Sequence, residues 1–210
     1  MATDGMASTL PRVAGGESAR TRTRRLITHG ALLLALVLSG LSIPVLLAPG
    51  IAEDTGLLHV AYAAGQECPD AQEAAFLRTI NKYRKRKGAK PLALSKPLML
   101  AAHKHSQDMA KMRRVRNHNL LGGVTTKQNL RNHGYPVGRA MWGENLAYGT
   151  SWKTGRKAFN AWKRSPGHRQ NMLNKRYRAI GIARVYDPNS TYKWYWTTTF
   201  GSVIGERPRC

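Results

Sequence analysis

The feature that most limits how this chain can fold is an uncharged run near its start, Ala31 to Leu47, made mostly of Leu, Ala and Val. Four basic residues stand just before it: Arg20, Arg22, Arg24 and Arg25. A basic segment followed by an apolar one is the pattern of an export signal. The sequence therefore predicts that the first part of the chain directs export and that the folded domain follows it.

Two outcomes of export remain open. Small residues at Ala61 to Ala64 form a cleavage site, which predicts the removal of a signal peptide, residues 1–63. The apolar run is also close to the length of a membrane span, so an uncleaved N-terminal anchor with its basic side inside is the alternative. In both cases we expect a linker over residues 64–71 and one domain over residues 72–210. That domain would be extracellular or held at the cell surface.

The two cysteines of the chain, Cys68 and Cys210, stand at the two ends of the exported part. Extracellular proteins commonly pair such cysteines, and the ends of a domain often lie close together. We therefore expect a Cys68–Cys210 disulfide. Two unrelated thiols are the alternative.

The exported part is strongly basic. The whole chain has 34 Lys and Arg and 11 Asp and Glu. Residues 1–63 contain five of the basic and four of the acidic residues. The remaining 29 basic and seven acidic residues give residues 64–210 a net charge of +22. Such a charge attracts polyanions over a long range. We expect anionic envelope polymers or lipid head groups as partners. No nucleic-acid recognition motif accompanies the charge, which speaks against specific nucleic-acid binding.

The order of elements predicts an α+β fold. Capping and periodicity indicate a helix from Asp70 to Gly88, a second after Ser95, a third from Thr125 or Thr126 to Gly134, and a fourth over residues 158–162 that ends before Pro166. A strand over residues 179–186, a turn and a second strand over 191–203 form a hairpin. Helices followed by a terminal hairpin indicate a three-layer α-β-α sandwich with a C-terminal antiparallel hairpin.

Three polar residues stand out as candidates for a shared site. His168 follows a Pro-Gly break at the start of a short helix, and His118 lies just beyond the second helix. Glu144 stands in a glycine-flanked segment that we interpret as irregular or extended around Gly143, in a loop capable of movement. His105 falls on the apolar side of the second helix. A packing histidine and an exposed glutamate that pairs with an arginine are the simpler interpretations.

Seven segments occur in a characteristic order: LRTINKYRKRKGAKPLAL, AAHKHSQDMA, NHNL, GENLAYG, AWKRSPGHRQNML, AIGIARVY and WYWTTTFG. Together they resemble the CAP superfamily of cysteine-rich secretory, antigen 5 and pathogenesis-related proteins, in the form of a bacterial SCP domain. The resemblance covers about residues 72–203 and implies an α-β-α sandwich.

The resemblance also implies a central cleft built from two His and two Glu that holds a divalent metal in some members. His118, Glu144 and His168 match three of these positions, and Ser165 replaces the second Glu. Asn145, Ser165 and Asn171 would line the same cleft. Two imidazoles and one carboxylate suit Zn²⁺ with Ser165 or water as fourth ligand, and the same atoms would equally form a metal-free hydrogen-bond network.

Three functions follow as hypotheses. The first is a monomeric secreted or surface-tethered CAP-domain protein that binds lipid, an envelope polymer or a protein partner. The second is a metal-dependent hydrolase of peptide or envelope material that uses the His118, Glu144 and His168 cleft, with Glu144 as base and Ser165 as nucleophile. The third is a cationic, antimicrobial-like protein that acts through charge alone. The residue pattern favours binding over catalysis, because no glycine-rich elbow surrounds Ser165.

Overall fold

The computed structural model describes residues 67–113 and 117–210, together with the backbone of residues 5–12. The uncharged run and the expected cleavage site lie outside the described residues. None of the described helices combines the length and the hydrophobicity of a transmembrane segment.

A five-stranded sheet forms the middle of the molecule, with the strands in the order β1, β3, β5, β4, β2. The strands are β1 (Gly5–Arg12), β2 (Ala93–Leu94), β3 (Trp142–Gly149), β4 (Ala179–Tyr186) and β5 (Trp194–Gly201). Strand β2 runs parallel to β4, and the other neighbours are antiparallel. The predicted C-terminal hairpin is therefore confirmed as β4 and β5.

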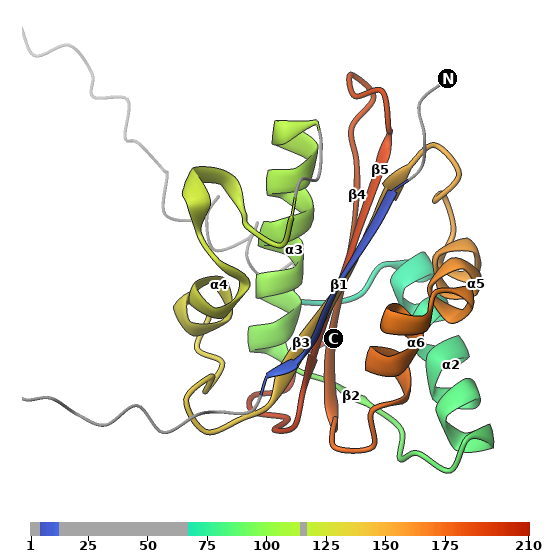
Figure 1. Ribbon diagram of the computed structural model, residues 1–210, viewed down its shortest axis with the longest axis vertical. Coiled ribbons are helices and arrows are strands. Elements are labelled where there is room, and N and C mark those ends of the chain that lie inside the picture. Colours follow the sequence, from blue (N-terminus) through green and yellow to red (C-terminus); the bar gives the residue numbers. More distant parts are fainter. Residues whose placement is uncertain (1–4, 13–66, 114–116) are drawn as a thin grey trace, which may run out of the picture.

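Helices cover both faces of the sheet, as Figure 1 shows. One layer contains α2 (Ala71–Arg86), α5 (Gly155–Arg164) and α6 (Pro166–Leu173). The other contains α3 (Lys96–Met112) and α4 (Thr126–Asn132), with a short 3-10 turn at Leu121–Gly123 between them. The predicted three-layer α-β-α sandwich is confirmed.

The helix starts follow the local sequence. Asp70 caps α2 through a capping box with Glu73, and Thr125 caps α4 through the same arrangement with Gln128. In each case the side chain of the first residue accepts from a backbone N–H that the helix itself cannot pair. These two starts were readable from the sequence because each signal lies within four residues.

Strand β3 shows that the segment around Gly143 takes the extended form of the two that were expected. Residues 142–149 form a strand near the middle of the sheet, and nearly all of them are buried, so Glu144 does not stand on a mobile loop. The glycine that suggested a loop, Gly143, is required by packing: a Cβ there would overlap the hydroxyl of Tyr177. Here a glycine marks a close approach rather than a turn.

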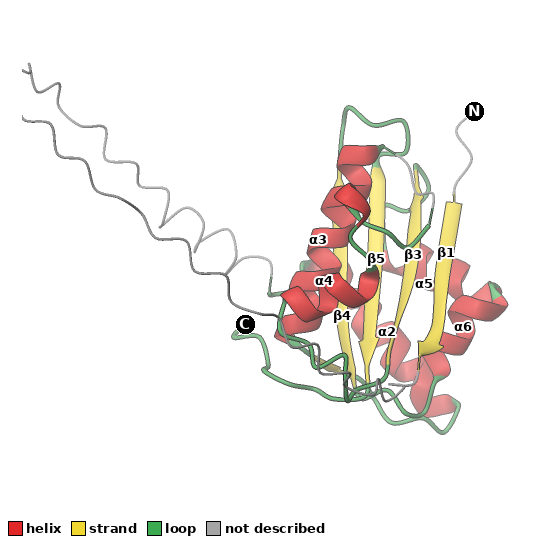
Figure 2. Cartoon of the chain, turned by 60° about the vertical axis from the view of Figure 1, so that its left-hand side comes forward, coloured by secondary structure: helices red, strands yellow, loops and turns green. Residues whose placement is uncertain are grey.

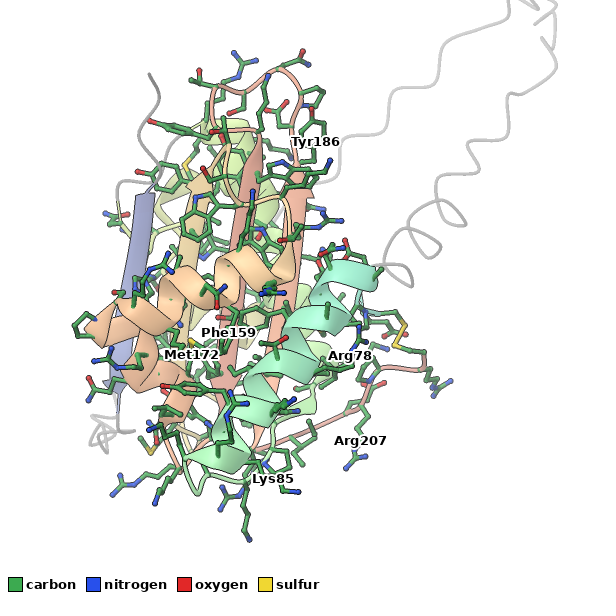
Figure 3. The ribbon with its side chains drawn as sticks, turned by 90° about the vertical axis from the view of Figure 1, so that its right-hand side faces the viewer. Arg78, Lys85, Phe159, Met172, Tyr186 and Arg207 are labelled. Atoms are coloured by element: carbon green, nitrogen blue, oxygen red, sulfur yellow. A yellow bond between two sulfur atoms is a disulfide. The ribbon has the colours of Figure 1, made fainter. Side chains whose placement is uncertain are left out.

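The core has one part on each side of the sheet. Under α2 and α5, Phe76 packs edge to face against Trp162 and tilted against Trp196. Figure 3 shows this side, with Phe159 and Met172 turned toward the sheet and Arg78 and Lys85 turned outward. Under α3, the buried residues include Leu98 and Leu146.

Candidate functional site

The most polar part of the interior is centred on Glu144 in β3. Its Oε2 lies 2.8 Å from Nδ1 of His105 in α3, and its Oε1 lies 2.8 Å from Nδ1 of His118, in the segment that follows α3. Glu144 and His105 have no exposed side-chain surface, and the side chain of His118 is 19% exposed. The sequence identified two members of this group, and the structure adds His105 as the third.

The hydrogen bonds set the donor and acceptor roles within the group. A carboxylate can only accept, so each histidine donates from Nδ1 to Glu144. Burial raises the pKa of Glu144, but the two imidazoles beside it outweigh burial and bring that pKa down to about 2. Glu144 is therefore ionised at neutral pH.

The fourth element tied to this group is α4. Oγ1 of Thr126 lies 2.9 Å from Oε1 of Glu144 and 2.9 Å from the carbonyl oxygen of His118. Residues from β3, α3, α4 and the intervening segment thus meet at one carboxylate. The Nε2 atoms of His105 and His118 are shielded from solvent and have no hydrogen-bond partner among the described residues.

His168, the third residue of the predicted cleft, lies in α6, and its Nδ1 is 2.7 Å from Oγ of Ser165. Leu146 packs in a cluster with Met109 of α3, whereas Ala147 packs with Trp162 of α5. Successive side chains of a strand point to opposite faces, so Glu144 faces α3 and the α6 side is left to Asn145.

Asn145 and Asn171 form a second network with His168. Nδ2 of Asn145 donates to the carbonyl oxygen of His168 at 3.1 Å. Nδ2 of Asn171 is placed between Oδ1 of Asn145, at 2.9 Å, and the carbonyl oxygen of Glu144, at 3.1 Å. The three predicted accessory residues, Asn145, Ser165 and Asn171, therefore lie together, on the face opposite Glu144. They fasten α6 to β3.

These positions do not fit the expected zinc site. Both oxygens of Glu144 face ring nitrogens that donate to them, so they are not turned toward a shared ion. Among residues 67–113 and 117–210, no group of three or more His, Cys, Asp or Glu side chains is placed to hold a metal ion. In the structure His118 and Glu144 belong to a hydrogen-bond network with His105.

A surface groove lies next to α5. It is open to solvent, has a volume of about 490 Å³, and is lined by Ser151, Trp152, Lys157, Asn160, Ala161 and Arg164. Lys157 and Arg164 are exposed, on the same stripe of the helix. Asn160 and Ser151 add an amide and a hydroxyl, and Trp152 adds an aromatic wall. This set can bind a ligand that is both anionic and rich in hydroxyl groups.

The groove lies in a stretch with an unusual charge pattern that was not recognised from the sequence. Between Glu144 and Asp187 there is no acidic residue, while ten are Lys or Arg. This stretch includes both helices α5 and α6. The positions of the acidic residues along the sequence, rather than their total in the domain, reveal this basic stretch between Glu144 and Asp187.

The two cysteines are joined. Cys68 and Cys210 form a disulfide, with their Cα atoms 5.5 Å apart, and the expected pairing is confirmed. Next to it, Nζ of Lys96 contacts both Glu67, at 3.0 Å, and Glu206, at 3.1 Å. The start and the end of the domain are thus held together at the first turn of α3.

Most of the domain is similar to known proteins. The family model described as Cysteine-rich secretory protein family (CAP) matches residues 77–200. The Uncharacterized protein YkwD of Bacillus subtilis is 31% identical over 138 residues, which are 66% of this chain and 50% of that protein. The chain therefore spans about half the length of this relative.

Two solved structures share the fold. An extracellular protein containing a SCP domain from Bacillus anthracis is 28% identical with a TM-score of 0.52, over 64% of this chain and 40% of that one. An outer surface protein from Borrelia burgdorferi is 22% identical with a TM-score of 0.54, over 63% of this chain and 95% of that one.

Proposed function

Because the chain belongs to the cysteine-rich secretory protein (CAP) family, we propose that it is an exported domain that binds anionic polymers of the cell envelope and performs no catalysis. The location is inferred from the basic and apolar leader and from structural neighbours described as extracellular or outer-surface proteins. The polymer would be bound along the α5 groove.

One observation carries this proposal: the groove combines exposed Lys157 and Arg164 with polar and aromatic walls, in a stretch of the chain without acidic residues. A polyanion carries many equivalent charges, so a basic face attracts it more strongly than it attracts a single small anion. Hydroxyl and amide groups in the groove could bind the sugar or polyol units between the charges. A flat basic surface would offer the electrostatic attraction without these hydrogen bonds.

The His105, Glu144 and His118 network favours binding over hydrolysis. A catalytic base needs a reactive atom within reach of a substrate, and here the oxygens of Glu144 are used by two histidines and Thr126 while the Nε2 atoms are shielded. Ser165 does contact His168, but Glu144 lies on the other face of the sheet and cannot orient that pair. The network acts as a structural connection between the layers.

The test uses a poly(glycerol phosphate) polymer as anionic probe and neutral dextran as control, with binding measured by sedimentation or calorimetry. Lys157→Glu with Arg164→Glu should weaken binding to the anionic polymer by about tenfold or more, equivalent to about 1.4 kcal/mol. The matched control, Lys127→Glu with Arg131→Glu, makes the same charge change on α4, on the opposite face of the sheet, and should have a much smaller effect. Wild-type binding should weaken as salt rises, because screening shortens the range of the attraction to about 8 Å at physiological ionic strength.

The other outcomes identify the rival functions. Equal loss in both double variants would mean that net charge alone drives binding, as in a cationic antimicrobial-like protein. Binding to anionic liposomes but not to the soluble polymer would assign the groove to lipid head groups. Turnover of a peptide or envelope substrate that Ser165→Ala abolishes would establish a hydrolase and overturn the non-catalytic proposal.

A further inference from the structure

The outermost strand of the sheet, β1, comes from the region that the sequence assigns to the export leader. Residues 5–9 of β1 pair with residues 144–148 of β3 in continuous antiparallel register, from Gly5 opposite Tyr148 to Thr9 opposite Glu144. In Figure 2, β1 forms the edge of the sheet and α6 lies beside it. The edge of β3 thus accepts an added strand along most of its length.

The expected export would remove this strand from the domain. Residues 5–12 precede the apolar run, so cleavage after Ala63 would leave them behind, and an uncleaved anchor with its basic side inside would hold them on the other side of the membrane from the domain. We infer that in the exported protein the vacated edge of β3 is a docking site for an extended peptide segment of a partner polypeptide, bound antiparallel in the position of β1. This inference rests on the export included in the proposed function.

The edge keeps its shape without β1, because other elements hold β3 in place. Strand β5 pairs with all eight residues of β3 on the opposite side. From the helix layer, Asn171 donates to the carbonyl oxygen of Glu144, and Nε1 of Trp162 donates to that of Leu146 at 3.2 Å. A strand already fixed in an extended conformation binds a peptide without a further ordering cost on its own side. Addition of a strand to such an edge uses main-chain hydrogen bonds for affinity.

The chemistry of the edge favours an acidic partner with small side chains. On the α6 side, β3 presents Gly143, Asn145, Ala147 and Gly149, which leave little bulk beside an incoming strand. The only carboxylate of β3, Glu144, is buried and already paired with two histidines. Residues 64–210 carry a net charge of +22, with Arg139 three residues before the strand and Arg169 in α6, so the field around the domain is positive. An extended segment that carries Asp or Glu complements this field.

The domain can be tested apart from the leader, since the described core clusters lie wholly between residues 76 and 204 and the disulfide closes the same unit. Amide exchange over residues 142–149 is compared between the unprocessed chain and the domain of residues 64–210. Alternate amides of β3 should exchange about tenfold faster or more in the domain, because half of its N–H groups face the vacated edge. A peptide with the sequence of residues 5–12 should restore protection.

Two peptide controls make the test specific. The same peptide with alternate backbone nitrogens methylated cannot form the ladder and should give no protection. A peptide with the Arg12→Glu change should bind about threefold more tightly at low salt, with the advantage lost at high salt. Full protection of β3 in the domain without peptide, or equal protection by the methylated peptide, would overturn the proposed docking site.

Two further results separate this inference from its premise. Residues 5–12 found on protein recovered outside the cell, by N-terminal sequencing, would overturn the expected export, whatever the peptides do. Protection of residues 142–149 that rises with protein concentration, together with dimers in sedimentation, would assign the edge to a second copy of the chain and overturn the peptide proposal.

Discussion

Glu144 and Asn145 are consecutive in β3, yet their side chains belong to hydrogen-bond networks on opposite faces of the sheet. Glu144 binds His105 and His118 on the side of α3 and α4, and Asn145 binds Asn171 and the backbone of His168 on the side of α6. One dipeptide thus connects both helical layers to the same strand.

Glu144→Gln should destabilise the fold by about 1–3 kcal/mol, because the amide nitrogen of Gln would face one of the two ring N–H donors and leave a buried donor unpaired. Urea unfolding measures the change. Thr126→Val removes one hydroxyl from the same carboxylate and should cost less than Glu144→Gln. Equal stability of Glu144→Gln and the wild type would mean that the network contributes nothing to folding.

The contribution of His103 to the free energy of unfolding should fall as the pH drops from about 6.5 to about 4, while Glu73, whose pKa burial raises to about 8, contributes in the opposite direction over this range. Burial lowers the pKa of His103 from 6.5 to about 4, and Asp70 opposes this only in part. Between about pH 6.5 and 4, His103 binds a proton in the unfolded chain but not in the folded chain. The contribution of His103 to the free energy of unfolding is therefore complete above pH 6.5 and is lost as the pH falls toward 4. Its Nε2 also has no described partner that could stabilise the charge.

Unfolding titrations of the wild type and His103→Gln at several pH values test this expectation. The free energy of unfolding of the variant, relative to that of the wild type, should rise as the pH falls from 6.5 to 4. At about pH 8 the histidine is neutral in both states, so the difference measured there gives the packing effect alone. Parallel curves for the two proteins over the whole range would contradict the assignment to His103.

Arg84→Lys should destabilise the domain by about 3 kcal/mol or more, although the charge is retained. The guanidinium of Arg84 is fully buried and donates to four carbonyl groups, those of Lys90, Met172, Asn174 and Tyr177, at 2.7–3.1 Å. An ammonium group cannot reach all four. Arg86→Lys, an exposed position on the same helix, should change the unfolding free energy by less than about 0.5 kcal/mol.

Removing the disulfide should lower the free energy of unfolding by up to about 4–5 kcal/mol in the chain-entropy model, because the bridge closes a loop with a sequence separation of 142. Cys68→Ser, Cys210→Ser and the double variant should have similar stabilities, since each breaks the same bond. Thermal unfolding with and without reductant checks this result independently. A wild type insensitive to reductant would show that the bridge adds no stability.

Gly181→Ala should destabilise the fold by about 1–3 kcal/mol or more, because the added methyl group would overlap the backbone of α3 at Leu98. Backbone atoms of a helix cannot move aside as a flexible side chain can. Gly138→Ala is the matched control, since a Cβ there meets no atom within 4 Å. If both substitutions have the same effect, the close approach of α3 to β4 is not what requires glycine.

The sequence predicted the elements whose signals are local. The capping box at Asp70, a cap at Thr125 or Thr126, the C-terminal hairpin and the layered fold class were readable, because each of these signals acts on its own neighbours. The buried position of β3 was not predicted, since Gly143 has the same appearance in a loop as in a strand that packs against Tyr177. Nor could Arg84 be distinguished from the solvated basic residues that follow it, because its four acceptors lie up to 93 residues away.

The candidate site was predicted only in part, because the contacts that build it join residues far apart in the sequence. His118 and Glu144 are brought together, and Asn145, Ser165 and Asn171 do surround His168, but the two groups lie on opposite faces of the sheet. Which face a residue occupies depends on the register of β3, and a shift by one position exchanges the faces. The spacing of residues in the sequence does not determine the register of β3.

The bridge between Cys68 and Cys210 has a mechanical consequence for a domain tethered at its N-terminal side and bound to a polymer at α5. A pulling force that enters at Cys68 is shared with the C-terminal segment through the covalent link, so it does not act on the first turn of α2 alone. The ion pairs of Lys96 with Glu67 and Glu206 lie at the same junction and spread the load to α3. Under tension the two ends of the domain would therefore stay joined, and the domain would resist stepwise unfolding from its N-terminus.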